Sequence, residues 1–159
     1  MKNIIIRTAI ISDLEAIQKL NQELCVKENR EYDRTINIDY PFSKNGEDYF
    51  RSRIESADSL ALIAEENKNT IGYLVGSIIA PETYRTITRM AEAENMYVKE
   101  SFRGLGIGSQ LNQRFEDWCR KNRAQRIRYV ASAGNIEAIK LYKKLGSKEV
   151  NITLEKELD

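Results

Sequence analysis

Apolar residues that recur at intervals of three and four predict four helices along the chain. Their stripes are Leu14, Ile17, Leu20 and Leu24; Phe50 and Ile54; Ile107, Leu111, Phe115 and Trp118; and Ile136, Ile139, Tyr142 and Leu145. Ser12 and Glu15 have the spacing of a capping box, so the first helix is expected to begin there. The second is expected to begin near Gly46, after an irregular polar stretch at 26–45, and the fourth is expected to end at Gly146.

Short runs rich in β-branched and aromatic residues predict six strands. They are residues 3–7, 60–64, 71–79, 87–98, 127–131 and 150–155, with a turn at 66–69 between the second and the third. The order strand, helix, helix, three strands, helix, strand, helix, strand joins an antiparallel meander to one crossover between parallel strands. We therefore expect an α+β fold over residues 1–159, a single domain whose mixed, mostly antiparallel sheet has helices on both faces.

Composition and charge narrow the classes of function. With 25 Lys and Arg against 24 Asp and Glu, the net charge of +1 gives no overall field for binding nucleic acid or an anionic membrane. No apolar run approaches the ~20 residues of a membrane span, and a cytoplasmic location is expected. Cys25 and Cys119 match no metal or redox spacing and lie on apolar stripes. The chain has no histidine, which excludes His-based triads and His-ligated metals, and no metal is expected.

Three alternating glycines stand where the third helix should begin. The loop consists of Gly104, Leu105, Gly106, Ile107, Gly108 and Ser109. Unpaired N–H groups and the helix dipole favour an anion at such a point, and glycine lets a phosphate approach closely. Ser109 occupies the third glycine position of a dinucleotide fingerprint, and no lysine follows as a P-loop requires. The loop therefore predicts a phosphate site of another kind; the alternative is a turn that binds nothing.

Arg103, Gly106 and Gly108 form the pattern Arg-x-x-Gly-x-Gly, preceded by Met-Tyr-Val. This pattern resembles the pyrophosphate loop of the GNAT superfamily of N-acetyltransferases, and the resemblance extends over essentially the whole chain. It implies acetyl-CoA as co-substrate, with its pyrophosphate on the loop N–H groups. The main-chain groups that would hold the pantetheine arm, along a splayed strand, belong to Met96, Tyr97 and Val98. Arg103 would contact phosphate or be a solvated loop arginine.

Asn135 and Tyr142 lie in a segment, Asn-x-x-Ala-x-x-x-Tyr, that also resembles the superfamily. There an asparagine binds the carrier and a tyrosine faces the sulfur. A phenol with a pKa near ~10 can donate a proton as charge develops on a thiol whose own pKa is ~8.5. The alternatives are a helix N-cap for Asn135 and a core aromatic for Tyr142.

A general base is needed because a lysine-type acceptor amine has a pKa near ~10.4. Strand alternation predicts that Glu92, Glu94, Met96 and Val98 share one face. Glu94 is the predicted base, since its segment resembles those of small-amine acetyltransferases with an acid at this point. Glu92 and water remain alternatives, and so does a solvent-facing strand glutamate with no role.

The sequence thus predicts an enzyme that moves an acetyl group from acetyl-CoA to a primary amine, on a small molecule or a peptide, by direct transfer in a ternary complex. The alternative is a non-catalytic acyl-CoA-binding or protein-interaction module of the same fold. Only about a dozen residues follow Gly146, whereas the superfamily's fold usually ends in two strands. Either the sheet is one strand short, or the last strand pairs with a second subunit in a homodimer.

Overall fold

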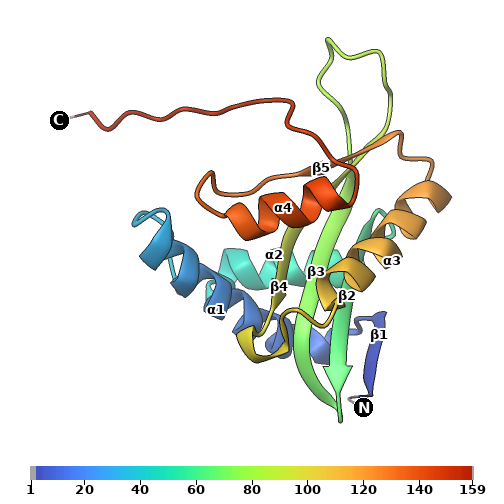
Figure 1. The fold of residues 1–159 in the computed structure, drawn as a ribbon. Helices are drawn as coiled ribbons and strands as arrows, with labels where there is room; N and C mark the ends of the chain where they lie inside the picture. Colours follow the sequence, from blue (N-terminus) through green and yellow to red (C-terminus); the bar gives the residue numbers. More distant parts are fainter. Residues whose placement is uncertain (1–2, 159) are drawn as a thin grey trace.

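A five-stranded sheet in the order β1-β2-β3-β4-β5 forms the centre of the protein in the computed structural model, which describes residues 3–158 (Figure 1). The strands and helices are β1 (Ile4–Thr8), α1 (Leu14–Glu31), α2 (Lys44–Glu55), β2 (Ser59–Glu66), β3 (Asn69–Ile79), β4 (Met90–Val98), α3 (Ile107–Lys121), β5 (Arg126–Tyr129) and α4 (Ile136–Lys144). Short 3-10 turns are η1 (Ile11–Asp13), η2 (Tyr40–Phe42) and η3 (Glu100–Phe102). Neighbouring strands from β1 to β4 are antiparallel and β4 pairs parallel with β5, so the predicted mixed sheet is confirmed.

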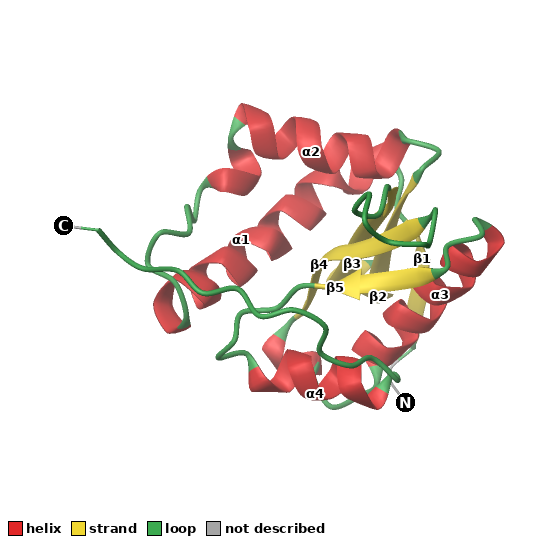
Figure 2. Cartoon of the chain, turned by 90° about the horizontal axis from the view of Figure 1, so that it is seen from above, coloured by secondary structure: helices red, strands yellow, loops and turns green. Residues whose placement is uncertain are grey.

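Helices cover both faces of the sheet, as predicted (Figure 2). On one face α1 and α2 contribute buried residues such as Ile17, Leu20 and Phe50 to a core with Tyr73 of β3. On the other face α3 packs its stripe of Ile107, Leu111 and Phe115 against the sheet. Alternate strand residues point to opposite faces, which divides the apolar side chains between these two cores. Within residues 3–158, no helix is both long enough and apolar enough to cross a membrane.

The first helix differs from the prediction at both ends. Ser12 lies within η1, and the carboxylate of Asp13 accepts the N–H of Ile10 at 2.8 Å, so Ser12 is not the cap. The helix continues to Glu31, beyond the expected end near Cys25. Residues 26–31 carry no strong helix breaker, and Lys27 pairs with Glu31 one turn later, at 3.8 Å. The polar composition of this stretch marks a helix face that is not packed in the apolar core.

A β-bulge in β4 corrects the predicted face of the candidate base. Val75 of β3 pairs with Asn95 and Gly76 pairs with Ala93, so Glu94 is the extra residue. Alternation is broken there, and Met96 packs in the core on the α3 face whereas Glu94 bonds to α2 on the opposite face. The prediction that Glu92, Glu94, Met96 and Val98 share one face is therefore wrong.

The two parallel strands separate beyond the bulge. Their pairing covers only Met90–Ala93 with Arg126–Tyr129, while β4 continues to Val98 along β3. The part of β4 after the bulge therefore has no neighbour on its β5 side within residues 3–158. We call this opening between the two strands the splay.

The predicted last strand is not formed. Residues 147–158 have no regular secondary structure and run away from the sheet (Figure 1). The alternating apolar side chains of Val150, Ile152 and Leu154 are exposed by 61%, 86% and 89%. An extended segment is stable only when its backbone groups and its apolar side find a partner, and no strand among residues 3–158 pairs with residues 150–155.

Candidate active site

The glycine loop presents an open backbone surface at the start of α3. Gly104 and Gly106 have φ values of 76° and 78°, and Gly106 is the N-cap of the helix. A Cβ at Gly104 would meet no atom within 4 Å, and one at Gly106 only the side chain of Gln110 at 3.9 Å. The unpaired N–H groups of the first helical turn are thus accessible, which fits the requirement of a bound phosphate.

The other loop residues anchor this surface. Ile107 is buried in the α3 core, Leu105 is exposed and Ser109 is half-buried. A Cβ at Gly108 would lie 3.3 Å from Leu141 of α4, so this glycine allows α4 to pack close to the start of α3. Two glycines of the motif therefore leave open space, and the third brings two helices together.

Arg103 folds back onto the end of β4. Its Nε donates a hydrogen bond of 3.0 Å to the carbonyl oxygen of Val98. Its guanidinium lies 5.4 Å from the ring centre of Tyr97, a distance that allows a cation–π contact. The Val98 carbonyl, one of the groups predicted to hold the pantetheine arm, thus already accepts one hydrogen bond from this arginine.

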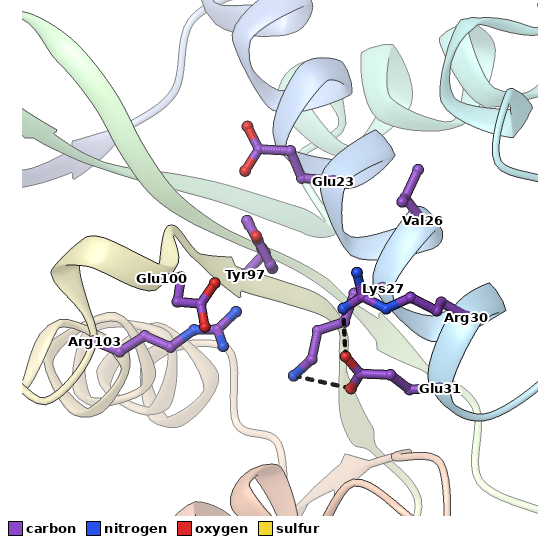
Figure 3. Close-up of a pocket in the computed structure, with 8 residues that line it drawn as sticks. All are labelled: Glu23, Val26, Lys27, Arg30, Glu31, Tyr97, Glu100 and Arg103. Carbon is purple, nitrogen blue, oxygen red and sulfur yellow. Dashed lines mark hydrogen bonds and ion pairs between the residues drawn. The ribbon is translucent and has the colours of Figure 1, made fainter.

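A pocket of about 180 Å³ lies between α1 and the end of β4 (Figure 3). It is lined by Glu23, Val26, Lys27, Arg30, Glu31, Tyr97, Glu100 and Arg103. Figure 3 shows Tyr97 and Arg103 on one side and the charged side chains of α1 on the other. Burial, followed by the charge of Glu23, raises the pKa of Tyr97. The pocket therefore holds charges of both signs around a phenol at the mouth of the splay.

Tyr142 lies on α4 and stacks on Tyr129, the last residue of β5. The ring centres are 4.3 Å apart and the planes are inclined by 23°. Burial and the charge of Glu28 raise the pKa of Tyr142 to about 12. Asn135 is the N-cap of α4, because its side-chain oxygen accepts the N–H of Ala138 at 3.2 Å. The cap expected for Asn135 is thus present, and its contact with the carrier stays a prediction.

Glu94 ties α2 to the sheet. Its carboxylate accepts hydrogen bonds from the hydroxyls of Tyr49 and Ser77 and from Nε of Arg53 at 2.7 Å. Burial, then the neighbouring charge of Glu94, raises the pKa of Tyr49. Glu92 is nearer to β5, where Arg128 lies 3.4 Å from its carboxylate. The base role of Glu94 stays a prediction, and it would require the carboxylate to exchange one of its donors.

Sequence reasoning missed Glu28, an acidic residue on the inner face of α1. It is half-buried, and its burial raises its pKa. The signal was available in the sequence: Glu28 follows Cys25 by three residues and so continues the helical stripe that the apolar pattern ended. An acidic residue at a stripe position is unusual unless it has a partner or a function.

Neither cysteine is placed for catalysis. Cys25 and Cys119 are buried, and burial raises the pKa of their thiols to about 11 and about 12. A thiol of this kind is a poor nucleophile, because the thiolate is the reactive form. In the part of the chain that the structure describes, no group of three or more Cys, Asp or Glu side chains could hold a metal.

The chain is similar to proteins of a known family. The family model described as "Acetyltransferase (GNAT) family" matches residues 22–147. The chain belongs to the GNAT family. An N-alpha-acetyltransferase from Sulfurisphaera tokodaii is 27% identical to this GNAT chain over 152 residues, which are 92% of this chain and 81% of that protein.

The GNAT fold is also shared with solved structures. The tetramutant of the BH1408 protein from Bacillus halodurans superposes with a TM-score of 0.84 at 20% identity, covering 97% of this chain and 99% of that chain. A protein described as a predicted acetyltransferase from Clostridium acetobutylicum, solved with acetyl-CoA, has a TM-score of 0.77 at 26% identity, covering 97% of this chain and 96% of that one. The GNAT fold over the described chain is thus confirmed.

Proposed function

We propose that this GNAT chain transfers an acetyl group from acetyl-CoA to a primary amine by direct transfer in a ternary complex. The observation that carries the proposal is the open glycine surface at the start of α3, beside a splay that leads to a half-buried phenol on α4. Family membership supports acetyl transfer, and the open loop and the phenol on α4 support the proposed roles of anion cradle and proton donor.

The chain's own groups would hold acetyl-CoA as follows. N–H groups of residues 104–109 bind the pyrophosphate, and main-chain groups of Met96, Tyr97 and Val98 bind the pantetheine arm. The Val98 carbonyl accepts one hydrogen bond from Arg103 and can accept a second from the arm; release of Arg103 would let the guanidinium turn toward phosphate. Asn135 contacts the carrier beside its capping bond. Acetyl-CoA supplies the activated thioester, and these groups orient it.

Tyr142 is the proposed acid that protonates the leaving thiolate. Its position at the end of β5, stacked on Tyr129, would direct the hydroxyl toward the splay where the thioester should lie. Direct transfer is favoured over an acyl-enzyme because both thiols are buried and have raised pKa values. Removal of the amine proton falls to an acidic residue or to water.

The acceptor would enter through the pocket between α1 and the end of β4. Glu23 and Glu100 offer negative charge to an ammonium group. Lys27 and Arg30, which pair with Glu31 at 3.8 Å and 2.6 Å, would exchange it for a carboxylate or phosphate further along the acceptor. This mixture suits a peptide N-terminus as well as a small amine. The Sulfurisphaera relative, an N-alpha-acetyltransferase, supports the former.

The test is release of free CoA from acetyl-CoA by the full chain. One reaction contains spermidine, amino acids and aminoglycosides, and the other contains short unblocked peptides. Release that depends on one of the acceptors, with the acetylated amine identified by mass spectrometry, is the expected result. Acetyl-CoA binding without release in either reaction would contradict the proposal and favour a binding module.

A further inference from the structure

The inner face of α1 runs from the strands β3 and β4 to the loop between β5 and α4. At one end the Asn21 side chain donates a hydrogen bond of 2.7 Å to the Tyr73 hydroxyl and lies 3.5 Å from the Asn95 side chain of β4. At the other end the Tyr32 ring lies 3.0 Å from where a Cβ on Gly134 would stand, one residue before the cap of α4. Figure 2 shows the C-terminal part of α1 beside the connection from β5 to α4.

Glu28 stands on this face between the two anchors. Positions 21, 25, 28 and 32 follow helical spacing and lie on one side of α1. Asn21 lies beside β3 and β4, and Tyr32 lies beside Gly134 after β5. Glu28, between them on the same side of the helix, therefore faces the opening between the two strands. On the α4 side of the opening, Tyr142 is the phenol whose pKa the charge of Glu28 raises.

The Glu28 carboxylate has no partner of its own. Among residues 3–158, no group donates a hydrogen bond to it and no cation forms an ion pair with it, since Lys27 is directed to Glu31. The titratable groups that interact electrostatically with it are Lys27, Cys25 and Tyr32 on α1, Tyr73 on β3 and Tyr142 on α4. A half-buried carboxylate without a donor from the described residues is available to accept a proton or a hydrogen bond from a ligand.

We propose that Glu28 is the general base of the transfer, taking the proton of the acceptor ammonium across the splay from Tyr142. This rests on the proposed function and assigns the base that the strand glutamates were expected to supply. Glu94 is held by three donors in the protein itself, whereas the Glu28 carboxylate is unoccupied by any described residue. Burial raises the pKa of Glu28, which brings it closer to the range of an effective base at neutral pH.

Each proton and each electron pair moved in this step has a donor and an acceptor. Glu28 removes one proton from the ammonium, and the neutral nitrogen forms a bond to the thioester carbonyl carbon. The carbon–sulfur bond then breaks, and the sulfur leaves with the bonding pair. Tyr142 gives its proton to the sulfur and regains one from the nitrogen through water, while Glu28 later releases its proton to solvent. The sum is an ammonium and a thioester giving an amide, a thiol and one proton.

Protonation of Glu28 also prepares the acid. The negative charge of Glu28 is one of the two causes of the raised pKa of Tyr142. Once Glu28 has taken the amine proton, this charge is gone and the phenol becomes the better donor. The base and the acid are thus coupled through space in the order in which the reaction uses them.

The experiment compares Glu28→Gln with the wild type and with Glu15→Gln, an exposed acid on the same helix. We measure kcat/KM for spermidine and for a short unblocked peptide between pH 6 and pH 10. The Gln variant should lose about 10²-fold in kcat/KM near pH 7. The loss should shrink as the pH approaches the amine's own pKa, ~8 for a peptide α-amine and ~10 for an alkylamine. Acetyl-CoA affinity should be unchanged, and Glu15→Gln should behave like the wild type.

Several outcomes would overturn the proposal. A loss of the same size at every pH would mean that Glu28 only positions the acceptor, and a pH-dependent loss in Glu94→Gln alone would return the base role to β4. If the wild type acetylated none of the acceptors, the proposed function itself would be contradicted. That result is distinct from an active enzyme whose kcat/KM is unchanged by Glu28→Gln, which would contradict the base role alone.

A readout without an acceptor tests the pairing of Glu28 and Tyr142. The ring-carbon NMR signal missing from Tyr142→Phe identifies this tyrosine, and its pKa should be lower in Glu28→Gln than in the wild type. An unchanged pKa would contradict the geometry. Urea unfolding at pH 8 should find Glu28→Gln at least as stable as the wild type. The reason is that a carboxyl with a raised pKa in the folded state loses its stabilising effect as the pH rises through that pKa.

Discussion

Replacing Gly106 with alanine separates the backbone strain of the loop from its binding role. At a φ of 78°, an L-residue costs about 1–2 kcal/mol, and no protein atom lies within 3.9 Å of the added Cβ to add a clash. The methyl group instead projects into the open space where a phosphate would approach. Loss of one or two charge-assisted hydrogen bonds, each about 1.5–3 kcal/mol, should weaken acetyl-CoA binding at least about 10-fold and up to about 100-fold or more.

Gly146 provides a matched control for that substitution. It has a φ of 93° and, like Gly104, no atom within 4 Å of an added Cβ, but it lies after α4 and away from the loop. Urea unfolding should show a similar loss of stability for both alanine variants, while isothermal titration with acetyl-CoA should show weakened binding for Gly106→Ala alone. Equal acetyl-CoA affinity in the two variants would refute the assignment of the loop as the phosphate cradle.

Three further predictions follow from contacts in the structure. Tyr142→Phe should lower kcat about 10²-fold and leave the Kd for acetyl-CoA unchanged. Stopped-flow turnover measures the first and titration the second; an unimpaired kcat would contradict the assignment of Tyr142 as the acid. Glu94→Gln should cost about 3 kcal/mol in urea unfolding, because Arg53 and Tyr49 lose a buried charged acceptor; a loss near zero would mean that the cluster does not hold α2. Hydrogen bonding from Arg7 lowers the pKa of Asp13, so this contribution to stability is present above the unfolded pKa of ~3.9 and is lost as the pH falls through the lower folded value. The urea midpoint should therefore fall less between pH 6 and pH 3 in Arg7→Met than in the wild type.

Local patterns were sufficient for most of the fold. The stripe of Ile107, Leu111 and Phe115 and the turn at 66–69 were readable because period and turn chemistry act over a few residues. The turn residues Asn67 and Lys68 both have positive φ values, which suits a tight hairpin between β2 and β3. The glycine loop was readable for the same reason, since strand, glycines and helix are consecutive in the sequence.

Features that depend on distant partners were not readable. The bulge at Glu94 is a property of the register between β3 and β4, and it reverses which side chains face α2. The role proposed for Glu28, whose carboxylate interacts electrostatically with tyrosines of β3 and α4, depends on the packing of α1. The strand expected at 150–155 had the right alternation, but it pairs with no strand among the described residues, although β5 is an edge of the sheet.

The shortness of α4 has a consequence for the dynamics of the enzyme. The helix has nine residues, none of them fully buried, and an isolated helix shorter than ~12–15 residues is marginal in water. Its attachment rests on contacts such as the stacking of Tyr142 on Tyr129 and the approach of Leu141 to Gly108. Amide protons of residues 136–144 should therefore exchange with solvent through local opening long before the sheet does. A co-substrate that binds only the docked helix, at a concentration a hundred times its Kd, would raise the free energy of that opening by ~2.7 kcal/mol. Hydrogen exchange in this one segment would therefore report occupancy of the site.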